Sequence, residues 1–234
     1  MFVPMVDRKN KIAQSFFTWL NKVVLGLHFQ ELKFSGLEHI PASGPFLAIA
    51  NHQSRWDGLL LFNAINRVAN YMVSPNELKG FQGNVIRSLG GFPADPRSNL
   101  LPYMQERLLH GEGIAIFPEG DVFRDGIMHP FKKGAARLIL DCYEKGIELP
   151  VVPIAIHYEG ATAHLVASGP MNLEETIQLG KQMQSGVIEM ITGELQERVI
   201  AVKNMLARSA ATLAIEVERN ANLSDPTNRC CEIA

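Results

Sequence analysis

Short apolar segments alternate with helical patterns along much of this chain, and that alternation constrains the fold more than any other feature. The apolar segments often contain Val or Ile, and turn residues bound most of them, so each is predicted to be a strand. The predicted strands are residues 46–50, 71–74, 113–117, 151–158 and 164–168. Strands that alternate with helices indicate an α/β fold with a mixed, mostly parallel sheet flanked by helices.

Helical periodicity appears between these strands and at both ends of the chain. The predicted helices are residues 59–65, 99–109 and 135–143, with a helical C-terminal extension from about 173 to 220. No internal repeat or low-complexity linker divides the chain, so we expect one domain. Its predicted parts are an N-terminal region (1–35), a core (36–172) and C-terminal helices with a tail (173–234).

The N-terminal helix predicted within residues 12–29 is amphipathic. Its apolar residues recur at helical spacing, but polar residues interrupt the stretch, and a bilayer-spanning helix needs about 20 mostly apolar residues. Residues 1–33 carry five basic side chains against two acidic ones. This pattern suits a helix that lies in a membrane interface. A helix packed on the domain core is the alternative.

Net charge argues against a nucleic-acid binder, and cysteine content argues against a disulfide-stabilised protein. A net charge of −2 excludes a nucleic-acid binder that works by bulk positive charge. The cysteines, Cys142, Cys230 and Cys231, form no disulfide pattern and indicate a reducing compartment. No Cys/His cluster has zinc spacing, so we expect no metal site. We also expect no bound cofactor. The last two cysteines lie in a polar tail that we expect to be disordered, and lipidation of this pair is the alternative.

The predicted strand 46–50 ends in Asn51 and His52, and Asp57 follows five residues after the histidine. A neutral histidine can accept a proton from a hydroxyl, and a neighbouring carboxylate holds its tautomer and stabilises the imidazolium. A helix that begins near Ser54 would place Asp57 in its first turn, within reach of His52. An ordinary polar turn explains the same residues, so the pair alone does not establish a catalytic site.

Further polar loops are expected beside this pair, because ligands gather at the carboxyl ends of strands in α/β sheets. They are "GGFPADPRSN" (90–99), "FPEGDVFRDG" (117–126) and "HYEG" (157–160). Basic residues lie in or beside them, and a guanidinium suits a phosphate. These are Arg97, Arg124, Lys132 and Lys133. G-x-S-x-G, nucleotide-loop and H-E-x-x-H motifs are absent, so a histidine base would activate the substrate's own hydroxyl in a direct transfer.

Four sequence blocks, taken together, resemble the glycerolipid acyltransferase family of 1-acylglycerol-3-phosphate O-acyltransferases. They are "NHQSRWD" (51–57), "GFPADPR" (91–97), "FPEG" (117–120) with "PFKKGA" (130–135), and "VVPIAI" (151–156) with "GP" (169–170). The blocks follow the family's order and intervals from about residue 36 to 170. The resemblance implies an α/β fold, a catalytic core at 36–172, and an N-terminal region that lies on a membrane surface.

The resemblance also implies a reaction. A fatty acyl group moves from an acyl thioester, on coenzyme A or acyl carrier protein, to a hydroxyl of a lysophospholipid such as 1-acylglycerol-3-phosphate. By position, His52 would be the general base and Asp57 its partner. Arg97 would hold the acceptor's phosphate, and Lys132 would lie near the donor or that phosphate. The protein would act at the cytoplasmic side of a membrane, as a peripheral or monotopic protein.

The third block departs from the family's common E-G-T-R. Glu119 and Gly120 match and would belong to the acceptor site, but Asp121 and Val122 replace the threonine and the arginine. Arg124 could reach the same place from another angle. A different lysolipid or polar acceptor therefore stays open. The alternatives to an active acyltransferase are a non-catalytic lipid-binding homologue and a soluble esterase.

Overall fold

The strand β2 (Phe46–Ala50) lies at the centre of the sheet, and all its residues are buried. Because successive side chains of a strand point to opposite faces, Leu47 and Ile49 join the apolar cluster on one face and the alternate residues join the cluster on the other. A strand buried on both faces has a continuous apolar sequence, which made β2 recognisable. The computed structural model describes residues 5–95, 97–183 and 186–224, without the side chains of residues 11 and 209–224.

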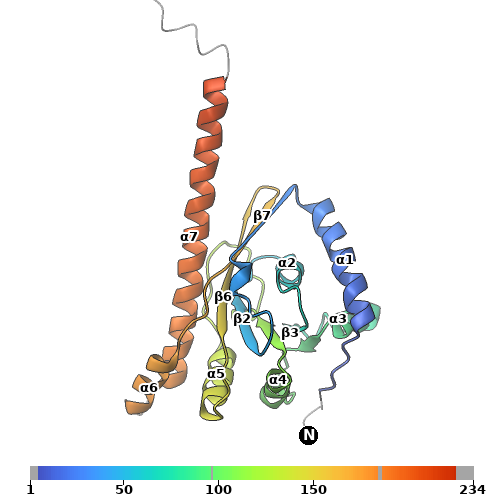
Figure 1. The fold of residues 1–234 in the computed structure, drawn as a ribbon, viewed down its shortest axis with the longest axis vertical. Coiled ribbons are helices and arrows are strands. Elements are labelled where there is room, and N and C mark those ends of the chain that lie inside the picture. Colours follow the sequence, from blue (N-terminus) through green and yellow to red (C-terminus); the bar gives the residue numbers. More distant parts are fainter. Residues whose placement is uncertain (1–4, 96, 184–185, 225–234) are drawn as a thin grey trace, which may run out of the picture.

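Six further strands complete a sheet with the order β1-β7-β6-β2-β5-β3-β4 (Figure 1). They are β1 (Glu31–Ser35), β3 (Ala69–Val73), β4 (Gly91–Pro93), β5 (Gly113–Ile116), β6 (Val151–Glu159) and β7 (Thr162–Ala167). Neighbouring strands are parallel except β6 and β7, which are antiparallel. The sheet is therefore mixed and mostly parallel, as predicted. The carboxyl ends of β6, β2, β5, β3 and β4 share one edge.

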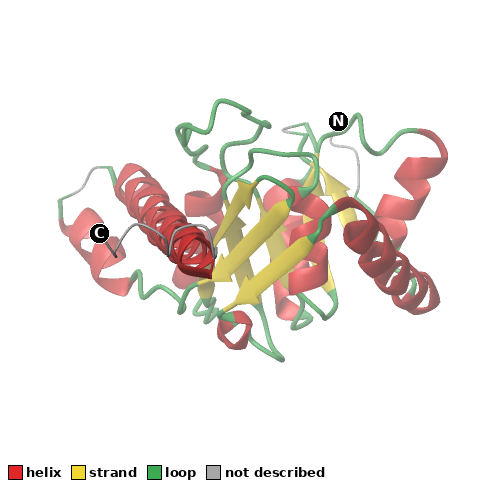
Figure 2. Ribbon diagram, turned by 90° about the horizontal axis from the view of Figure 1, so that it is seen from above, coloured by secondary structure: helices red, strands yellow, loops and turns green. Residues whose placement is uncertain are grey.

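Helices cover both faces of the sheet (Figure 2). The cluster on one face includes residues of α1 (Lys11–His28) and α2 (Asp57–Ala64). The cluster on the other face includes residues of α4 (Leu100–Leu109), α5 (Gly134–Glu144), α6 (Glu174–Gln182) and α7 (Val187–Ser224). A short helix, α3 (Gly80–Ser88), leads into β4, and a 3₁₀ turn covers Leu37–His39. The helical C-terminal extension is thus confirmed as α6 and α7.

The predicted strands are all present within a few residues of their expected limits, but β1, β4 and α3 were not predicted. In β1, exposed residues alternate with half-buried ones, so this edge strand lacks an apolar run. The strand β4 has only three residues. Limits at 35 and 172 for the parts of the domain stay a prediction. The tail with Cys230 and Cys231 lies outside the described residues.

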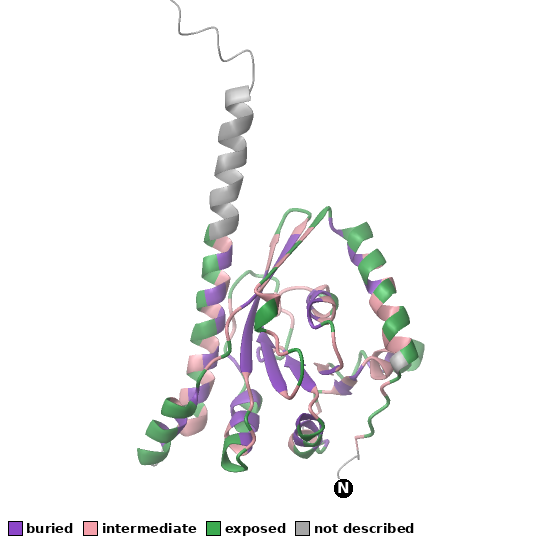
Figure 3. Ribbon diagram, in the orientation of Figure 1, coloured by how far each residue is buried: buried purple, intermediate pink, exposed green. Residues whose placement is uncertain are grey.

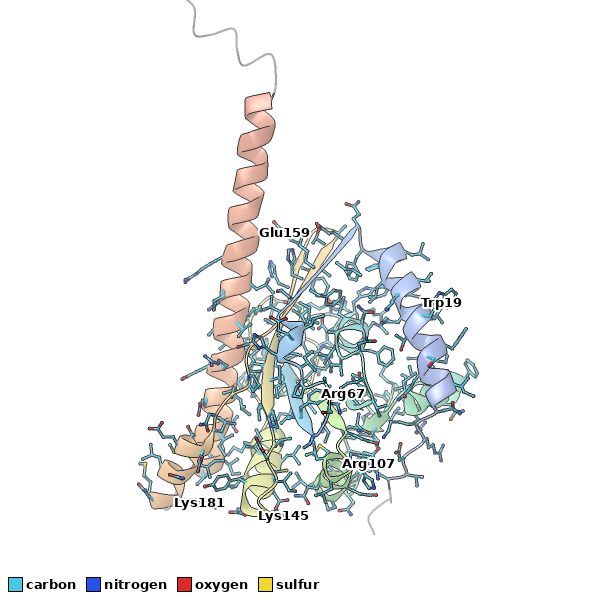
Figure 4. All side chains as sticks on the ribbon, in the orientation of Figure 1. Trp19, Arg67, Arg107, Lys145, Glu159 and Lys181 are labelled. Carbon is cyan, nitrogen blue, oxygen red and sulfur yellow. The ribbon has the colours of Figure 1, made fainter. Side chains whose placement is uncertain are left out.

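The helix α1 carries an exposed apolar stripe. Figure 3 shows exposed residues along this helix, and Figure 4 labels one member of the stripe, Trp19. It begins at a side-chain cap, since Asn10 accepts hydrogen bonds from the next turn, and Asn21 on its buried side donates to the carbonyl of Leu59 at 3.0 Å. The stripe consists of Ile12, Phe16, Trp19, Val23 and Leu27, all of which are exposed to solvent. Among the described residues, no helix combines the length and apolar character needed to cross a membrane.

Candidate functional site

The side chain of Asn51 fastens the end of β2 to β6. Its Nδ2 donates to the carbonyl of Ile156 at 3.0 Å, and its Oδ1 accepts the N–H of the same residue at 2.8 Å. Asn51 is buried, so these bonds satisfy polar groups that would otherwise be costly. The side-chain amide thus takes the place of a main-chain partner for β6 at the point where the chain turns out of β2. This contact sets the direction in which His52 leaves the sheet. This role of Asn51 is not predicted by the local sequence pattern.

The structure brings His52 and Asp57 together. The Nδ1 of His52 lies 2.8 Å from Oδ2 of Asp57, and the carboxylate is fully buried at the first position of α2. The same Oδ2 accepts the main-chain N–H groups of Gln53 and Ser54 at 2.7 and 2.8 Å. The other oxygen, Oδ1, accepts the hydroxyl of Tyr158 at 2.5 Å. The helix begins at Asp57 rather than near Ser54, and the expected proximity follows from this turn.

The second ring nitrogen of His52 is available for chemistry. The imidazole stacks on Phe117, with 4.1 Å between ring centroids, and its side chain keeps 18% of its surface exposed. A neutral imidazole that donates from Nδ1 to Asp57 carries its lone pair on Nε2. Within the described parts of the chain, no hydrogen bond engages Nε2. A histidine held in this way can accept a proton at Nε2.

Glu119 lies next to His52, where it connects two loops. Its Oε1 accepts the main-chain N–H of His52 at 2.6 Å, and its Oε2 accepts that of His129 at 2.9 Å. The residue is buried. The N–H of Phe123 also donates to the carbonyl of His52 at 3.1 Å. The loop after β5 is therefore tied to the main chain of the histidine, and both oxygens of Glu119 are occupied by protein donors.

Gly120 and Lys132 lie against each other in the same loop region. Gly120 has φ of +73°, and a Cβ there would lie 2.3 Å from Nζ of Lys132. Glycine therefore satisfies both the backbone conformation and the close approach of the lysine. The ammonium lies 3.4 Å from the carbonyl oxygen of Gly120 and stays exposed to solvent. A cation is thus available on the loop that Glu119 ties to His52.

The two arginines proposed for phosphate binding make no contact with His52 in the described residues. Arg97 is exposed and forms a two-point ion pair with Asp95, at 3.1 Å for both contacts. This hydrogen bonding lowers the pKa of the Asp95 carboxyl. Because β4 lies three strands from β2, the loop that carries Arg97 starts roughly 14 Å from the histidine. Arg124 is exposed, and no described residue bonds to it.

The departure in the third block lies on the surface of the loop. Asp121 is exposed, and its Oδ1 accepts the N–H of Val122 at 2.8 Å. Within the described residues it forms no ion pair with Arg124. A second histidine–carboxylate pair, which the sequence analysis missed, follows in this loop. Nε2 of His129 lies 2.7 Å from Asp125, and this hydrogen bond lowers the pKa of the Asp125 carboxyl.

The described side chains include no group of three or more His, Cys, Asp or Glu residues that could hold a metal ion. The polar side chains around His52 lie at the carboxyl edge of the sheet, the edge at which β6 ends in Glu159, a residue labelled in Figure 4. Tyr158 on this strand is the contact of Asp57 that the sequence analysis did not single out. Its stretch "HYEG" was recognised only as a polar strand end.

Comparison with known proteins adds a family. A family model described as Acyltransferase matches residues 31–157, which is more than half of the chain. The 1-acyl-sn-glycerol-3-phosphate acyltransferase BAT2, chloroplastic, of Brassica napus is 25% identical over 219 residues, 88% of this chain and 60% of that protein. The 1-acyl-sn-glycerol-3-phosphate acyltransferase of Pseudomonas aeruginosa is 28% identical over 146 residues, 60% of this chain and 53% of that protein. The chain thus spans little more than half the length of these curated relatives.

A solved structure has the same fold. The crystal structure of the 1-acyl-sn-glycerophosphate (LPA) acyltransferase PlsC from Thermotoga maritima superposes with a TM-score of 0.66. The match covers 83% of this chain and 79% of that chain, at 22% sequence identity. The likeness extends beyond the matched family region, since it includes more of the chain than residues 31–157.

Proposed function

The chain belongs to the Acyltransferase family, and from this premise we propose that it transfers a fatty acyl group from an acyl thioester to a hydroxyl of a lysophospholipid. The donor is coenzyme A or acyl carrier protein carrying the acyl group. The acceptor that the curated relatives' names favour is 1-acyl-sn-glycerol-3-phosphate, and its product is phosphatidic acid. Residues 36–172 form the catalytic core of this proposal, which requires no bound cofactor.

The observation that carries the proposal is the hydrogen bond between His52 and Asp57 at 2.8 Å, with Nε2 of the histidine left open. In the proposed reaction, Nε2 takes the proton of the acceptor hydroxyl while the hydroxyl oxygen attacks the thioester carbonyl carbon. The tetrahedral oxyanion then collapses, the ester forms, and the leaving sulfur takes the proton from the imidazolium to give a free thiol. Asp57 stabilises the imidazolium between these two steps.

The proposed acceptor carries a phosphate, and exposed cations lie on the loops around the pair. Lys132 lies on the loop tied to the main chain of His52, and Arg124 is exposed on the same loop. Arg97 follows β4 at the same sheet edge and already holds a carboxylate in the two-point geometry that a phosphate uses. Asp121 would repel a phosphate, but it is exposed and bonds to its own loop, so solvent screens its charge.

We also propose that α1 holds the protein on a membrane surface as a peripheral protein. The lysolipid and the acyl product reside in a bilayer, so the enzyme must reach them there. The exposed stripe from Ile12 to Leu27 runs along one side of α1, and Lys22 on the same helix is exposed. Apolar residues on one side with basic residues beside them favour an interfacial helix.

The experiment is an acyl transfer assay on the full chain with His52→Ala. A radiolabelled acyl group is supplied either on coenzyme A or on acyl carrier protein, and each donor is combined with a panel of lysolipids. We expect wild-type protein to form a diacyl product and His52→Ala to lose about 10²–10⁴-fold of the rate, the usual contribution of a general base. His110→Ala, which changes an exposed histidine at the end of α4, is the matched control.

Three outcomes would contradict the proposal. Unchanged transfer in His52→Ala would exclude the histidine as the base. Lipid binding without a product from any pair of donor and acceptor would identify a non-catalytic lipid-binding homologue. Release of free fatty acid in place of an acylated product would indicate an esterase instead.

A further inference from the structure

The carboxylate of Asp57 is held on both of its oxygens, and the second one depends on Tyr158. Oδ2 accepts three hydrogen bonds, one of them from His52. In the described parts of the chain, the hydroxyl of Tyr158 is the single donor to Oδ1, at 2.5 Å. Since Asp57 has no exposed surface, water cannot replace this donor without a rearrangement.

The hydroxyl adds to the restraint on the rotation of the carboxylate. A carboxylate torsion is broad on its own, so the hydrogen bonds to both oxygens together determine it. With Tyr158 on Oδ1, the plane of the group is set, and Oδ2 faces Nδ1 of His52. Burial and the charge of Asp57 both raise the pKa of the Tyr158 hydroxyl, so it stays a protonated donor throughout the neutral pH range.

The ring of Tyr158 is itself held by the end of α1. Phe29, which follows the last residue of that helix, stacks on it with 5.8 Å between centroids and 21° between planes. Phe29 is buried and also meets Trp56, the residue before Asp57, edge to face. The phenol therefore approaches Asp57 from a packed aromatic cluster rather than from a free loop.

We propose that Tyr158 is a positioning residue for the transfer reaction, whose hydroxyl holds the Asp57 carboxylate so that His52 keeps its proton on Nδ1 and its lone pair on Nε2. The inference rests on the proposed function and deepens it. Tyr158 lies one residue beyond the matched family region, 31–157, so the family match assigns it nothing. The residue acts through Asp57 and does not contact the substrate.

Tyr158→Phe removes the hydroxyl and keeps the ring that packs on Phe29. If the loss of this hydrogen bond to a charged group raises the activation barrier by the usual energy of such a bond, kcat should fall by about 10- to 100-fold. KM for donor and acceptor should stay within about twofold, since no substrate contact is lost. Tyr71→Phe is the matched control, because its hydroxyl is buried and has no partner among the described residues.

A pH profile adds a readout that a purely structural role would not move. The charged groups that contact His52 are Asp57, at Nδ1, and Glu119 on the loop after β5, at the main-chain N–H. Lys132 lies on the loop that Glu119 ties to His52. Only the Asp57 carboxylate loses a donor in Tyr158→Phe, so its charge stabilises the imidazolium more strongly. The acidic limb of kcat/KM should therefore move to higher pH. Replacing Tyr158 by difluorotyrosine, a stronger donor of similar shape, should move the limb to lower pH without removing the hydroxyl.

A double-mutant cycle separates this role from a general loss of structure. If Tyr158 acts through Asp57, adding Tyr158→Phe to Asp57→Asn should have little further effect on kcat. If the two substitutions lower kcat independently, so that their factors multiply in the double variant, the inference is wrong. It is also wrong if Tyr158→Phe leaves both kcat and the acidic limb unchanged. In substrate-free protein labelled with ¹⁵N-histidine, the Nδ1 proton resonance of His52 should shift in Tyr158→Phe and stay in Tyr71→Phe. An unmoved resonance would also overturn it.

Failure of the proposed function gives a different result. In that case wild-type protein forms no product, or His52→Ala is as active as wild type. Failure of this inference leaves wild type active, His52→Ala inactive and Tyr158→Phe equal to wild type. The thermal midpoint of each variant is measured alongside, and the difluorotyrosine protein decides the question if Tyr158→Phe does not fold.

Discussion

Glu119 accepts the main-chain N–H of His52 through Oε1, and the two atoms are 2.6 Å apart. The other oxygen of Glu119 accepts the N–H of His129 from the far side of the same loop. A buried carboxylate with two main-chain donors is a brace between loops. By family position this glutamate is expected in the acceptor site, which stays a prediction, and its described contacts are all within the protein.

Glu119→Gln tests whether this residue is a brace or a substrate contact. The amide keeps one oxygen acceptor but turns an NH₂ toward a main-chain N–H, so one of the two bonds is lost. We expect a lower kcat with little change in the acceptor KM, and a loss of about 1–3 kcal/mol in the free energy of unfolding, measured by urea denaturation. A raised acceptor KM with unchanged stability would identify a substrate contact instead.

The exchange of Glu77 for Gln is the matched control for this measurement. Glu77 is exposed and its described side-chain partner is Gln82, an exposed residue in a region remote from β2 in sequence. Glu77→Gln should leave kcat as in wild type and the unfolding free energy within about 0.5 kcal/mol of wild type, as surface substitutions usually do.

The sequence predicted the centre of the sheet and the His52–Asp57 pair for a physical reason. β2 is buried on both faces and therefore has an unbroken apolar sequence, and the pair is closed by a local turn of five residues. Local patterns carry this kind of information. The edge strand β1 shows only partial burial and was missed.

The contacts that support the pair could not be predicted from local patterns. Glu119 and Tyr158 lie 67 and 101 residues from the groups that they bond. They meet the pair only because β5 and β6 flank β2 in the sheet order. A one-residue slip of β6 would turn Tyr158 to the other face, and the apolar sequence of that strand does not specify its register by alternation.

Arg97 and Arg124 are expected to bind the phosphate of the acceptor. Each is exposed, so the alanine variants Arg97→Ala and Arg124→Ala should fold normally. A lost charge-assisted bond should raise KM for 1-acylglycerol-3-phosphate about 10-fold, while transfer to monoacylglycerol, which has no phosphate, should be unchanged. Arg137→Ala, an exposed change on α5, is the control. If both variants and their double variant have the wild-type KM for 1-acylglycerol-3-phosphate, these arginines do not bind the phosphate.

His164 on β7 should make the stability depend on pH. Burial lowers its pKa, and the positive charges of Lys33 and His157 act in the same direction. Because the folded pKa lies below the unfolded value of about 6.5, the unfolded state binds more protons between the two values. Stability should therefore be complete above about pH 6.5, fall as the pH decreases through this window, and level off below the folded pKa.

Urea denaturation at about pH 5, 6, 7 and 8 checks this expectation. His164→Gln removes the titrating group, so the difference between pH 5 and pH 7 should become smaller than in wild type. His110→Gln changes an exposed histidine and should leave that difference as it is. If His164→Gln shows the same pH dependence as wild type, other groups are responsible for it.

The aromatic residues Phe16 and Trp19 of α1 should control binding to membranes. They are 54% and 60% exposed, and burying their free surface in lipid contributes roughly 2 kcal/mol each at about 25 cal/mol per Å². Phe16→Gln with Trp19→Gln should therefore reduce partitioning into anionic phosphatidylglycerol vesicles by at least about 100-fold, measured by co-sedimentation. Leu109→Gln with Met205→Gln alters similarly exposed residues on α4 and α7 and is the control. Acyl transfer to a detergent-dispersed acceptor should persist in the α1 variant, since neither residue contacts the His52–Asp57 pair. Undiminished sedimentation of that variant would show that another surface meets the lipid.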